Sequence, residues 1–385
     1  MIMTTDTKRK NLSEENKIEL ALERFSPMEY GGKPTSLEYL SKKYKRAVPV
    51  ISRAINEAIN KRWVVIRVTR TKEMIPIRVK SLEEKLIKTF PDLRIAIVVD
   101  FQKEDSHENH KALGISIAEF LYKNLQLLIE DGDVIGVGSG RGPYYTVSSL
   151  ARFTKNNKIL KKEVTLISLT GIISPQAPTS QSIELLFDSD QCIRDLSACF
   201  SGPIILKEIS FPVAHDNLND IITRTWLNSR DFQEHTPRYA IVGVGVLKEQ
   251  HRFLLDVKAI NEGKEGSKIL EPVRKDMKEL VSIVAKYDPS PVADICNRLF
   301  YVNSVPVKPD DKNRIQYLID CVNRKLLTVS WEQLQKIRNV ILVAGTKAKA
   351  LAIHQILKEP LCHVGILCTD SVTAKAIIDA EKNYL

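Results

Sequence analysis

Two short segments of the chain carry side chains that could bind an anion. In the first, residues 138–142 read Gly-Ser-Gly-Arg-Gly and directly follow the apolar run 134–137. Glycines let backbone amides approach a ligand closely, and a serine hydroxyl with an arginine fork suits a phosphate group. In the second, Lys347 and Lys349 follow the apolar run 340–343. Because cations at the start of a helix oppose its dipole, these lysines are better explained if an anionic ligand sits with them.

Neither segment matches a nucleotide-binding signature. Arg141 stands where a dinucleotide fingerprint that starts at Gly136 needs its last glycine, and no Gly-Lys-Ser/Thr triplet follows. A tight turn with a solvent-facing arginine and a pair of solvated lysines are the alternatives. The polar stretch 107–110 could bind a metal, but it is typical of a loop before a helix. We see no catalytic triad order and no paired carboxylates, so we predict no catalytic residues, no metal and no cofactor.

The segments that position these residues alternate between short apolar runs and helical stretches. Strands are predicted over residues 95–99, 134–137, 164–169, 239–246, 340–343 and 364–368. Helices are predicted over residues 81–89, 112–130, 181–198, 277–287, 347–358 and 371–381. This alternation favours an α/β fold with a doubly wound, mostly parallel sheet that is covered by helices on both faces. Ligands bind outside the carboxyl ends of the strands in such sheets, where both anion-binding segments fall.

Nearly all of the excess positive charge lies in the first 80 residues. They hold 18 Lys and Arg against 9 Asp and Glu, whereas the remaining 305 residues hold 39 against 38. A basic segment on a neutral body is typical of a DNA-binding domain. A solvated pair of helices that keeps the protein in solution is the alternative.

The basic segment has the pattern of a helix-turn-helix. Thr35-Ser36-Leu37-Glu38 is a capping box that starts the first helix, and residues 45–47 make the turn. Pro49 suits the first turn of a second helix, whose apolar residues recur at helical spacing. The residues expected to contact DNA are Lys42, Lys43, Lys45, Arg46, Val50, Ser52, Arg53 and Asn56. Among them, the polar residues of the second helix, Ser52, Arg53 and Asn56, are expected near base edges.

The predicted organisation has four parts. They are a disordered N-terminus (1–12), a winged helix-turn-helix domain (13–70) with a wing strand over 63–70, a connector helix (71–90), and an effector and oligomerisation domain (91–385). No apolar run approaches the roughly 18 residues that span a bilayer, and the start has no apolar core of a signal peptide. Six cysteines occur without a Cys-x-x-Cys pair. We therefore expect a cytoplasmic protein with reduced thiols and no membrane partner.

Together these motifs resemble the SorC family of bacterial sugar-responsive transcriptional regulators. The family's Asp-Gly-Asp-x-Ile-Gly-Val-x-Trp-Gly-Arg loop is similar to residues 131–141, and its Ser-Arg-x-x-Val-Ser-Arg recognition helix to residues 47–53. Its Gly-Asp-Ile-Cys-Gly-Arg-Phe-Phe motif is similar to residues 293–300. Its Val-Ala-Gly-Gly-x-x-Lys motif matches residues 343–349, and its Val-Thr-Asp-x-x-x-Ala motif is similar to residues 368–374.

The resemblance implies a helix-turn-helix joined to an effector domain like sugar-phosphate isomerases and glucosamine-phosphate deaminases. It places the family's ligand lysine at Lys349 and makes Asp294 a ligand contact. The residues expected in the effector site are Gly138, Ser139, Gly140, Arg141, Gly142, Thr170, Gly171, Asp294 and Lys349. The chain departs from the family where Ser139 replaces Trp and where Gly142-Pro143 replaces Thr-Leu. Residues 200–235 hardly match, so the identity of the effector stays open.

We therefore expect a DNA-binding transcriptional regulator of carbohydrate metabolism genes, a repressor controlled by a phosphorylated sugar or a related metabolite. Its expected partners are operator DNA and the effector, and it would be nucleoid-associated when bound to DNA. One short recognition helix gives weak specificity, so a homodimer or homotetramer that reads repeated half-sites is expected. The alternative is a sugar-phosphate isomerase or deaminase with a basic head, for which Asp294 is the candidate acid/base carboxylate.

Overall fold

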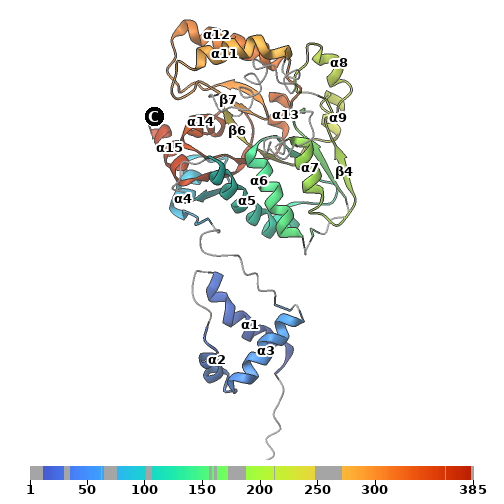
Figure 1. The fold of residues 1–385 in the computed structure, drawn as a ribbon, viewed down its shortest axis with the longest axis vertical. Helices are drawn as coiled ribbons and strands as arrows, with labels where there is room; N and C mark the ends of the chain where they lie inside the picture. Colours follow the sequence, from blue (N-terminus) through green and yellow to red (C-terminus); the bar gives the residue numbers. More distant parts are fainter. Residues whose placement is uncertain are drawn as a thin grey trace, which may run out of the picture. The chain divides into compact units, whose positions relative to one another are not determined.

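The structure is a computed structural model, and contacts between residues divide it into two compact units, Met1–Lys72 and Glu73–Leu385 (Figure 1). It describes residues 12–29, 35–61, 63–64, 76–100, 106–155, 158–159, 163–171, 188–211, 213–247, 271–359 and 361–382. Within these ranges, no helix is both long and apolar enough to span a bilayer. Residues 1–11, most of the predicted wing strand and the start of the predicted connector lie outside the described residues.

The described part of the first unit contains three helices, α1 Glu14–Glu29, α2 Leu37–Tyr44 and α3 Val48–Asn60. They bury a small common core of Leu20, Ala21, Leu40, Ile51, Ala54, Ile55 and Ala58. The α3 members recur at helical spacing, so α3 buries one face and leaves the other outside. Lys45 ends α2 in the left-handed conformation (φ 50°), and the amide of Arg46 donates to the carbonyl of Ser41. The predicted helix-turn-helix is confirmed in its two helices and its turn.

The predicted start of α2 is wrong by one residue. Ser36 is the N-cap, and its Oγ accepts from the amide of Tyr39 at 3.1 Å. Thr35 instead donates from Oγ1 to the carbonyl of Glu23 at 2.9 Å, and its amide donates to the carbonyl of Arg24. Thr35 therefore fastens the end of the α1–α2 connection to α1, which leaves the capping position to the next hydroxyl.

The second unit is built on a parallel sheet whose described strands follow the order β1-β10-β9-β5-β2-β3-β4. These strands are β1 Ile95–Val99, β2 Val134–Val137, β3 Val164–Ser168, β4 Ile204–Lys207, β5 Tyr239–Val242, β9 Asn339–Val343 and β10 Val364–Asp370. After β2 the chain continues through β3 to β4 at one edge of the sheet, whereas after β5 it continues through β9 to β10 toward the other edge. The direction in which strands are added therefore reverses between β2 and β5, which are neighbours. The predicted doubly wound, mostly parallel sheet is confirmed, and its switch point is where a ligand is expected.

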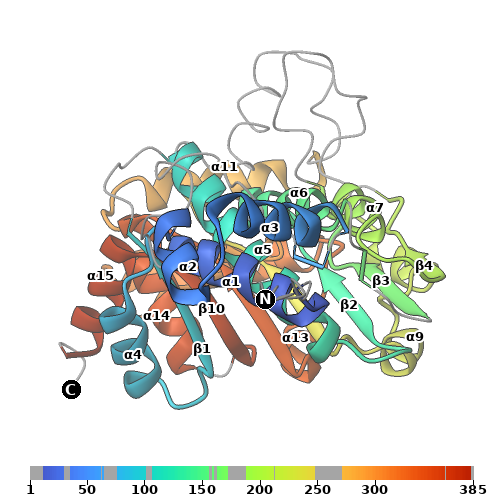
Figure 2. The ribbon, with the colours of Figure 1, turned by 90° about the horizontal axis from the view of Figure 1, so that it is seen from below.

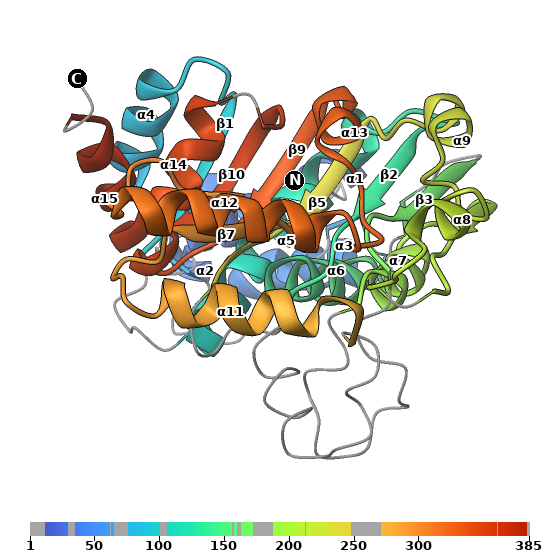
Figure 3. The ribbon, with the colours of Figure 1, turned by 90° about the horizontal axis from the view of Figure 1, so that it is seen from above.

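Helices cover both faces of this sheet (Figures 2 and 3). On one face lie α5 Ser106–Leu128, α6 Arg141–Thr154 and α7 Ser189–Ser197. On the other lie α4 Lys80–Thr89, α9 Ser229–Glu234, α13 Trp331–Lys336, α14 Ala350–Lys358 and α15 Ser371–Lys382, with α8 Leu218–Ile222 beside them. Along β9, Val340 and Leu342 join one core while Ile341 and Val343 join the other. Both faces of the strand are thus buried, which is why the run is apolar without interruption.

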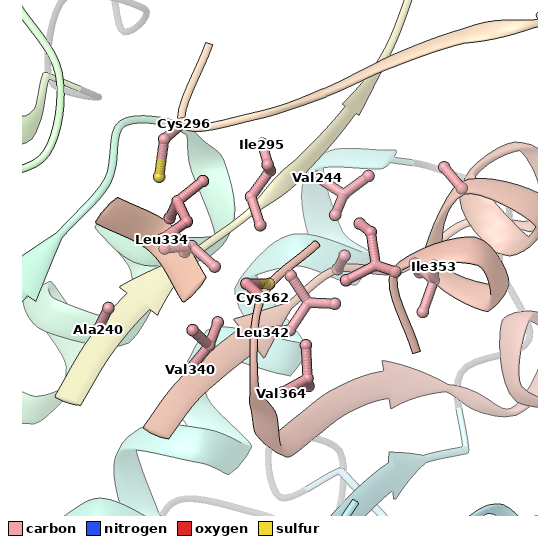
Figure 4. Close-up of a cluster of buried hydrophobic side chains, with 14 of the residues drawn as sticks. Ala240, Val244, Ile295, Cys296, Leu334, Val340, Leu342, Ile353, Cys362 and Val364 are labelled. Carbon is pink, nitrogen blue, oxygen red and sulfur yellow. The ribbon is translucent and has the colours of Figure 1, made fainter. Parts of the chain in front are cut away.

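The predicted strand over residues 239–246 is wrong, because it is two strands in two sheets. β5 ends at Val242, and β6 Val244–Val246 pairs antiparallel with β7 Val292–Ile295, which pairs with β8 Arg298–Tyr301. α11 Arg274–Val284 and α12 Pro309–Asn323 lie together over this small sheet (Figure 3). The other face of β7 packs into the main core, where Ile295 and Cys296 share a cluster with Ala240 and Leu342 (Figure 4).

The stretch predicted as a connector contributes α4 to the second unit. Leu82, Leu86 and Phe90 are buried in the main core. Arg78 pairs with Val99 of β1, and its guanidinium binds the buried carboxylate of Glu83 at 2.7 and 2.9 Å. The described part of this stretch is therefore a packed element of the second unit.

Candidate anion-binding site and DNA interface

β2 ends at Val137, and the glycine-rich segment leads directly into α6. Gly140 is the N-cap of α6 with a φ of +116°, a conformation that favours glycine. It offers no side chain to cap the first amides of the helix, and such helix starts attract anions. Arg141 is the first residue of α6 and is partly buried. A guanidinium therefore lies at the same end as the helix dipole's positive pole.

Gly142 has a packing role that sequence reasoning missed. A Cβ atom at this position would lie 2.3 Å from the carbonyl oxygen of Val343, the last residue of β9. The start of α6 therefore touches the end of β9. This close approach brings the two predicted anion-binding segments together at the switch point, with Ser139 buried beside them.

The second segment differs from its prediction. Lys347–Lys349 form a 3-10 turn, and α14 starts at Ala350, three residues later than expected. Lys347 is exposed, whereas Lys349 is partly buried and its Nζ lies 3.0 Å from Nε2 of His110. Because an ammonium group has only donors, Nε2 of His110 accepts this hydrogen bond. Of the two lysines, Lys349 is the one that reaches the predicted site.

Charged groups from three further elements act on Lys349. Burial lowers the pKa of Lys349 to about 8; the negative charges of Asp294 and Asp370 oppose this shift, and the positive charge of Arg141 adds to it. These residues belong to β7, β10 and α6. The structure therefore places Arg141, Asp294 and Lys349, which the sequence assigned to one site, within electrostatic range of one another.

α5 contributes two residues that the sequence did not assign to this site. The stretch 107–110 belongs to the first turns of α5 and is not a loop. His110 contacts Lys349 as described, and Nδ2 of Asn109 donates to Oδ2 of Asp370 at 3.0 Å. In the part of the chain that the structure describes, no group of three metal-ligating side chains is present. The polar pattern of this stretch is the available signal, but by itself it indicates a loop before a helix, with a metal site as the alternative.

A two-residue turn between β7 and β8 forms another wall of the site. Cys296 and Asn297 are both left-handed, with φ of 51° and 63°, as a tight hairpin requires. The amide of Asn297 donates to Oδ2 of Asp294 at 3.1 Å. Cys296 lies against the glycine-rich segment, because a Cβ on Gly138 would be 3.0 Å from its Sγ. The hairpin therefore holds Asp294 beside the segment that carries Arg141.

Thr170 and Gly171 join the site through this hairpin. Thr170 forms a bridge with Thr328, and the amide of Gly171 donates to the carbonyl of Leu327 at 2.8 Å. Oγ1 of Thr328 donates in turn to the carbonyl of Cys296. These two residues are thus placed on the hairpin side of the site, and Arg141 and Lys349 form the cationic side.

The residues predicted to contact DNA lie around the α2–α3 turn. Val50, Arg53 and Asn56 are exposed on the outer face of α3, with Ser52 partly buried; Lys42, Lys43 and Lys45 are exposed, and Arg46 is partly buried. Nζ of Lys43 lies 2.7 Å from Oε1 of Glu23 on α1, so its charge is already shared. Lys42 is therefore the better lysine for testing a phosphate contact.

An apolar pocket elsewhere in the second unit is a different feature. It lies between the sheet and α5, α6 and α7, and its lining includes Leu121, Ile135, Leu150 and Ile341. Among the residues that the structure describes, no charged side chain lines it. An anion has no partner there, so this pocket does not compete with the site at the switch point.

Comparison with known proteins identifies the fold. Residues 316–379 match a family model described as "Putative sugar-binding domain". The full-length sorbitol operon regulator SorC from Klebsiella pneumoniae is similar with a TM-score of 0.55 and 18% identity, covering 95% of this chain and 98% of that chain. A DeoR family transcriptional regulator from Listeria monocytogenes (TM-score 0.53, 20% identity) covers 77% of this chain and 98% of its own. A transcriptional regulator from Streptococcus pneumoniae TIGR4 (TM-score 0.53, 19% identity) covers 79% and 97%. No curated protein matches the chain. The predicted resemblance to SorC regulators is confirmed at the level of the fold.

Proposed function

We propose that this chain is a transcriptional regulator of the SorC type, which binds operator DNA through its helix-turn-helix and a phosphorylated sugar through its α/β unit. The observation that carries the proposal is the gathering of Arg141, Lys349 and the start of α6 at the switch point of the sheet. Likeness to a full-length sorbitol operon regulator over 95% of the chain supports it.

The charges of the site suit a ligand with two different ends. Arg141 and Lys349 provide charge-assisted donors for a phosphate group. Asp294 is 7% exposed and adds a carboxylate, which accepts hydrogen bonds from hydroxyl groups but repels a phosphate. A phosphate at the cationic side and hydroxyls at the hairpin side therefore fit the arrangement better than a simple anion does.

Regulation follows if the effector binds one arrangement of an oligomer better than another. Such differential binding shifts the equilibrium between arrangements that fit DNA differently well. We propose a homodimer or homotetramer for this reason, because a single recognition helix such as α3 covers only a short half-site. The protein would act in the cytoplasm as a repressor of carbohydrate metabolism genes.

A thermal-shift panel tests the proposed function. Phosphorylated sugars should raise the melting temperature more than their unphosphorylated counterparts, without being turned over in a parallel assay. The best ligand should then change the affinity for operator DNA that the protein itself selects from genomic fragments. Turnover would favour the isomerase or deaminase alternative, and the absence of any stabilising phosphate ester would contradict the proposal.

Arg53→Ala should weaken operator binding by about 1–3 kcal/mol and relax base preference at one position, if α3 lies in the major groove. The reason is that Arg53 is exposed on the outer face of α3, within reach of base edges. Lys42→Ala should instead weaken all sequences alike and reduce the salt dependence by about one counterion. Fluorescence anisotropy with operator and scrambled DNA at several salt concentrations measures both effects.

Lys43→Ala is the matched control in this comparison. Because Lys43 is paired with Glu23, we expect a smaller effect on the salt dependence than that of Lys42→Ala. Unchanged operator affinity in the Arg53→Ala protein would show that α3 does not present this face to DNA.

A further inference from the structure

We propose that Asn297 donates a hydrogen bond to a hydroxyl group of the effector and so helps to determine which sugar the site accepts. The inference rests on the proposed function, because it assigns Asn297 to the same site. This side chain belongs neither to the two anion-binding segments nor to the ligand contacts that the resemblance implies.

Asn297 carries a buried donor that no described residue uses. Only 8% of the residue is exposed, and among the described residues its Nδ2 has no hydrogen-bond partner. Buried polar atoms without a partner are uncommon and costly, so such an atom calls for an explanation. Ligand binding at a site that is already lined by polar groups is the explanation that the surroundings favour.

The conformation of the turn does not explain why the residue is asparagine. Its φ of 63° is favourable for glycine and tolerated by asparagine. A glycine at this position would therefore form the same hairpin without a side chain, and the amide group is an addition to it.

The position of Asn297 links it to the rest of the site. Its amide binds the carboxylate of Asp294, and the charge of Asp294 acts on Lys349. The neighbouring Cys296 packs against Gly138 of the glycine-rich segment. On the same side, Oγ1 of Thr170 is a second buried polar atom with no partner among the described residues, and Thr170 is 1% exposed. Within the described part of the chain, the hairpin side of the site thus has two hydrogen-bonding atoms without a partner.

The side chains of Asp294 and Asn297 together favour a ligand that carries hydroxyl groups. A carboxylate only accepts hydrogen bonds, whereas Nδ2 of an amide only donates them. A hydroxyl group both donates and accepts, so one hydroxyl, or two on neighbouring carbons, can accept from Nδ2 of Asn297 and donate to the carboxylate of Asp294. The ligand class is therefore a phosphorylated sugar with hydroxyls at the end away from its phosphate.

The Asn297→Gly variant tests this assignment, because glycine keeps the turn. The probes are ribose 5-phosphate, 2-deoxyribose 5-phosphate, glucose 6-phosphate, fructose 6-phosphate and inorganic phosphate, each titrated into the full chain by calorimetry. The sugar phosphate that binds the wild type most tightly should bind the variant about tenfold more weakly. The affinity for inorganic phosphate should stay unchanged, because Arg141 and Lys349 are intact in the variant. Asn297→Asp, which replaces the donor by an acceptor in the same shape, should lose at least as much.

The exposed Asn303, whose Nδ2 donates to Glu359, provides a matched control as Asn303→Gly and should bind every probe like the wild type. Wild-type affinity of the Asn297→Gly protein for the sugar phosphate would overturn the inference and leave the proposed function standing. If the unliganded variant melted at a lower temperature and its affinities were unchanged, Nδ2 of Asn297 would bind a structural water instead of the effector. That result would also overturn the inference. If none of the sugar phosphates bound the wild type, the proposed function itself would fall.

Discussion

Lys349→Ala and Arg141→Ala should each weaken binding of the phosphorylated effector by about ten- to a hundredfold. Hydrogen bonds to charged groups contribute about 1.5–3 kcal/mol, and about 1.4 kcal/mol corresponds to a factor of ten in affinity. DNA binding without effector should stay nearly intact, because the helix-turn-helix folds around its own core in the other unit. Titrating the best ligand of the panel into protein with labelled operator measures both quantities.

The same experiment at several pH values separates the contribution of the Lys349 charge from that of the shape of its side chain. Since the pKa of Lys349 is lowered to about 8, the ammonium form prevails at pH 7 and is lost as the pH rises through that value. A bound phosphate favours the charged form, so the affinity of the wild type should fall above pH 8. Lys349→Arg should remove this fall, because arginine stays charged there. Arg141→Lys should restore affinity only in part, because an ammonium cannot replace a bidentate fork.

Wild-type ligand response in both alanine variants would place the effector site elsewhere. His354→Gln is a useful control, because His354 is also buried in this unit but is bound to Glu381 on α15. It should alter stability without a specific loss of ligand affinity. A loss of affinity in this control as large as that in Lys349→Ala would show that the measurement reports unfolding.

The cationic side of the site could be predicted because its residues follow strands that are visible in the sequence. β2 is apolar throughout and β9 is apolar after Asn339, and the residues after such runs meet at one edge of a parallel sheet. The contact between them could not be predicted, because it depends on Gly142 packing against the carbonyl of Val343. A glycine in a turn and a glycine in a helix–strand contact look the same in a sequence.

The hairpin side was placed by resemblance alone. β7 and β8 have four residues each and are joined by Cys296 and Asn297, which are not the usual glycines of a hairpin turn. β6 was hidden because it follows β5 after one residue, so a single apolar run covered two strands in different sheets. His110 was missed because its contact with Lys349 joins residues 239 positions apart in the chain.

Loss of the Asp370 carboxylate should strongly destabilise the second unit. It is 1% exposed at the end of β10. Its Oδ2 accepts from the amide of Thr346 at 2.7 Å, from Oγ1 of Thr373 at 2.8 Å and from Nδ2 of Asn109 at 3.0 Å. Its Oδ1 accepts from the amide of Thr373 at 2.7 Å. One carboxylate therefore fixes the turn before Lys349, the start of α15 and the first turns of α5.

Asp370→Ala should lower the free energy of unfolding by about 3 kcal/mol or more, because several charge-assisted hydrogen bonds are lost and buried donors remain without a partner. Thr373→Val removes one of these bonds and should cost about 1–2 kcal/mol. Asp379→Ala on the same helix removes an exposed ion pair with Lys382 and should change stability by less than about 0.5 kcal/mol. Chemical denaturation of the three variants measures this order.

The affinity for phosphate should follow the same order, because the turn that carries Lys349 is released only when the carboxylate is lost. Equal stability of Asp370→Ala and Asp379→Ala would show that the turn before α14 keeps its conformation without the Asp370 carboxylate. Lys349 would then contact His110 without that carboxylate.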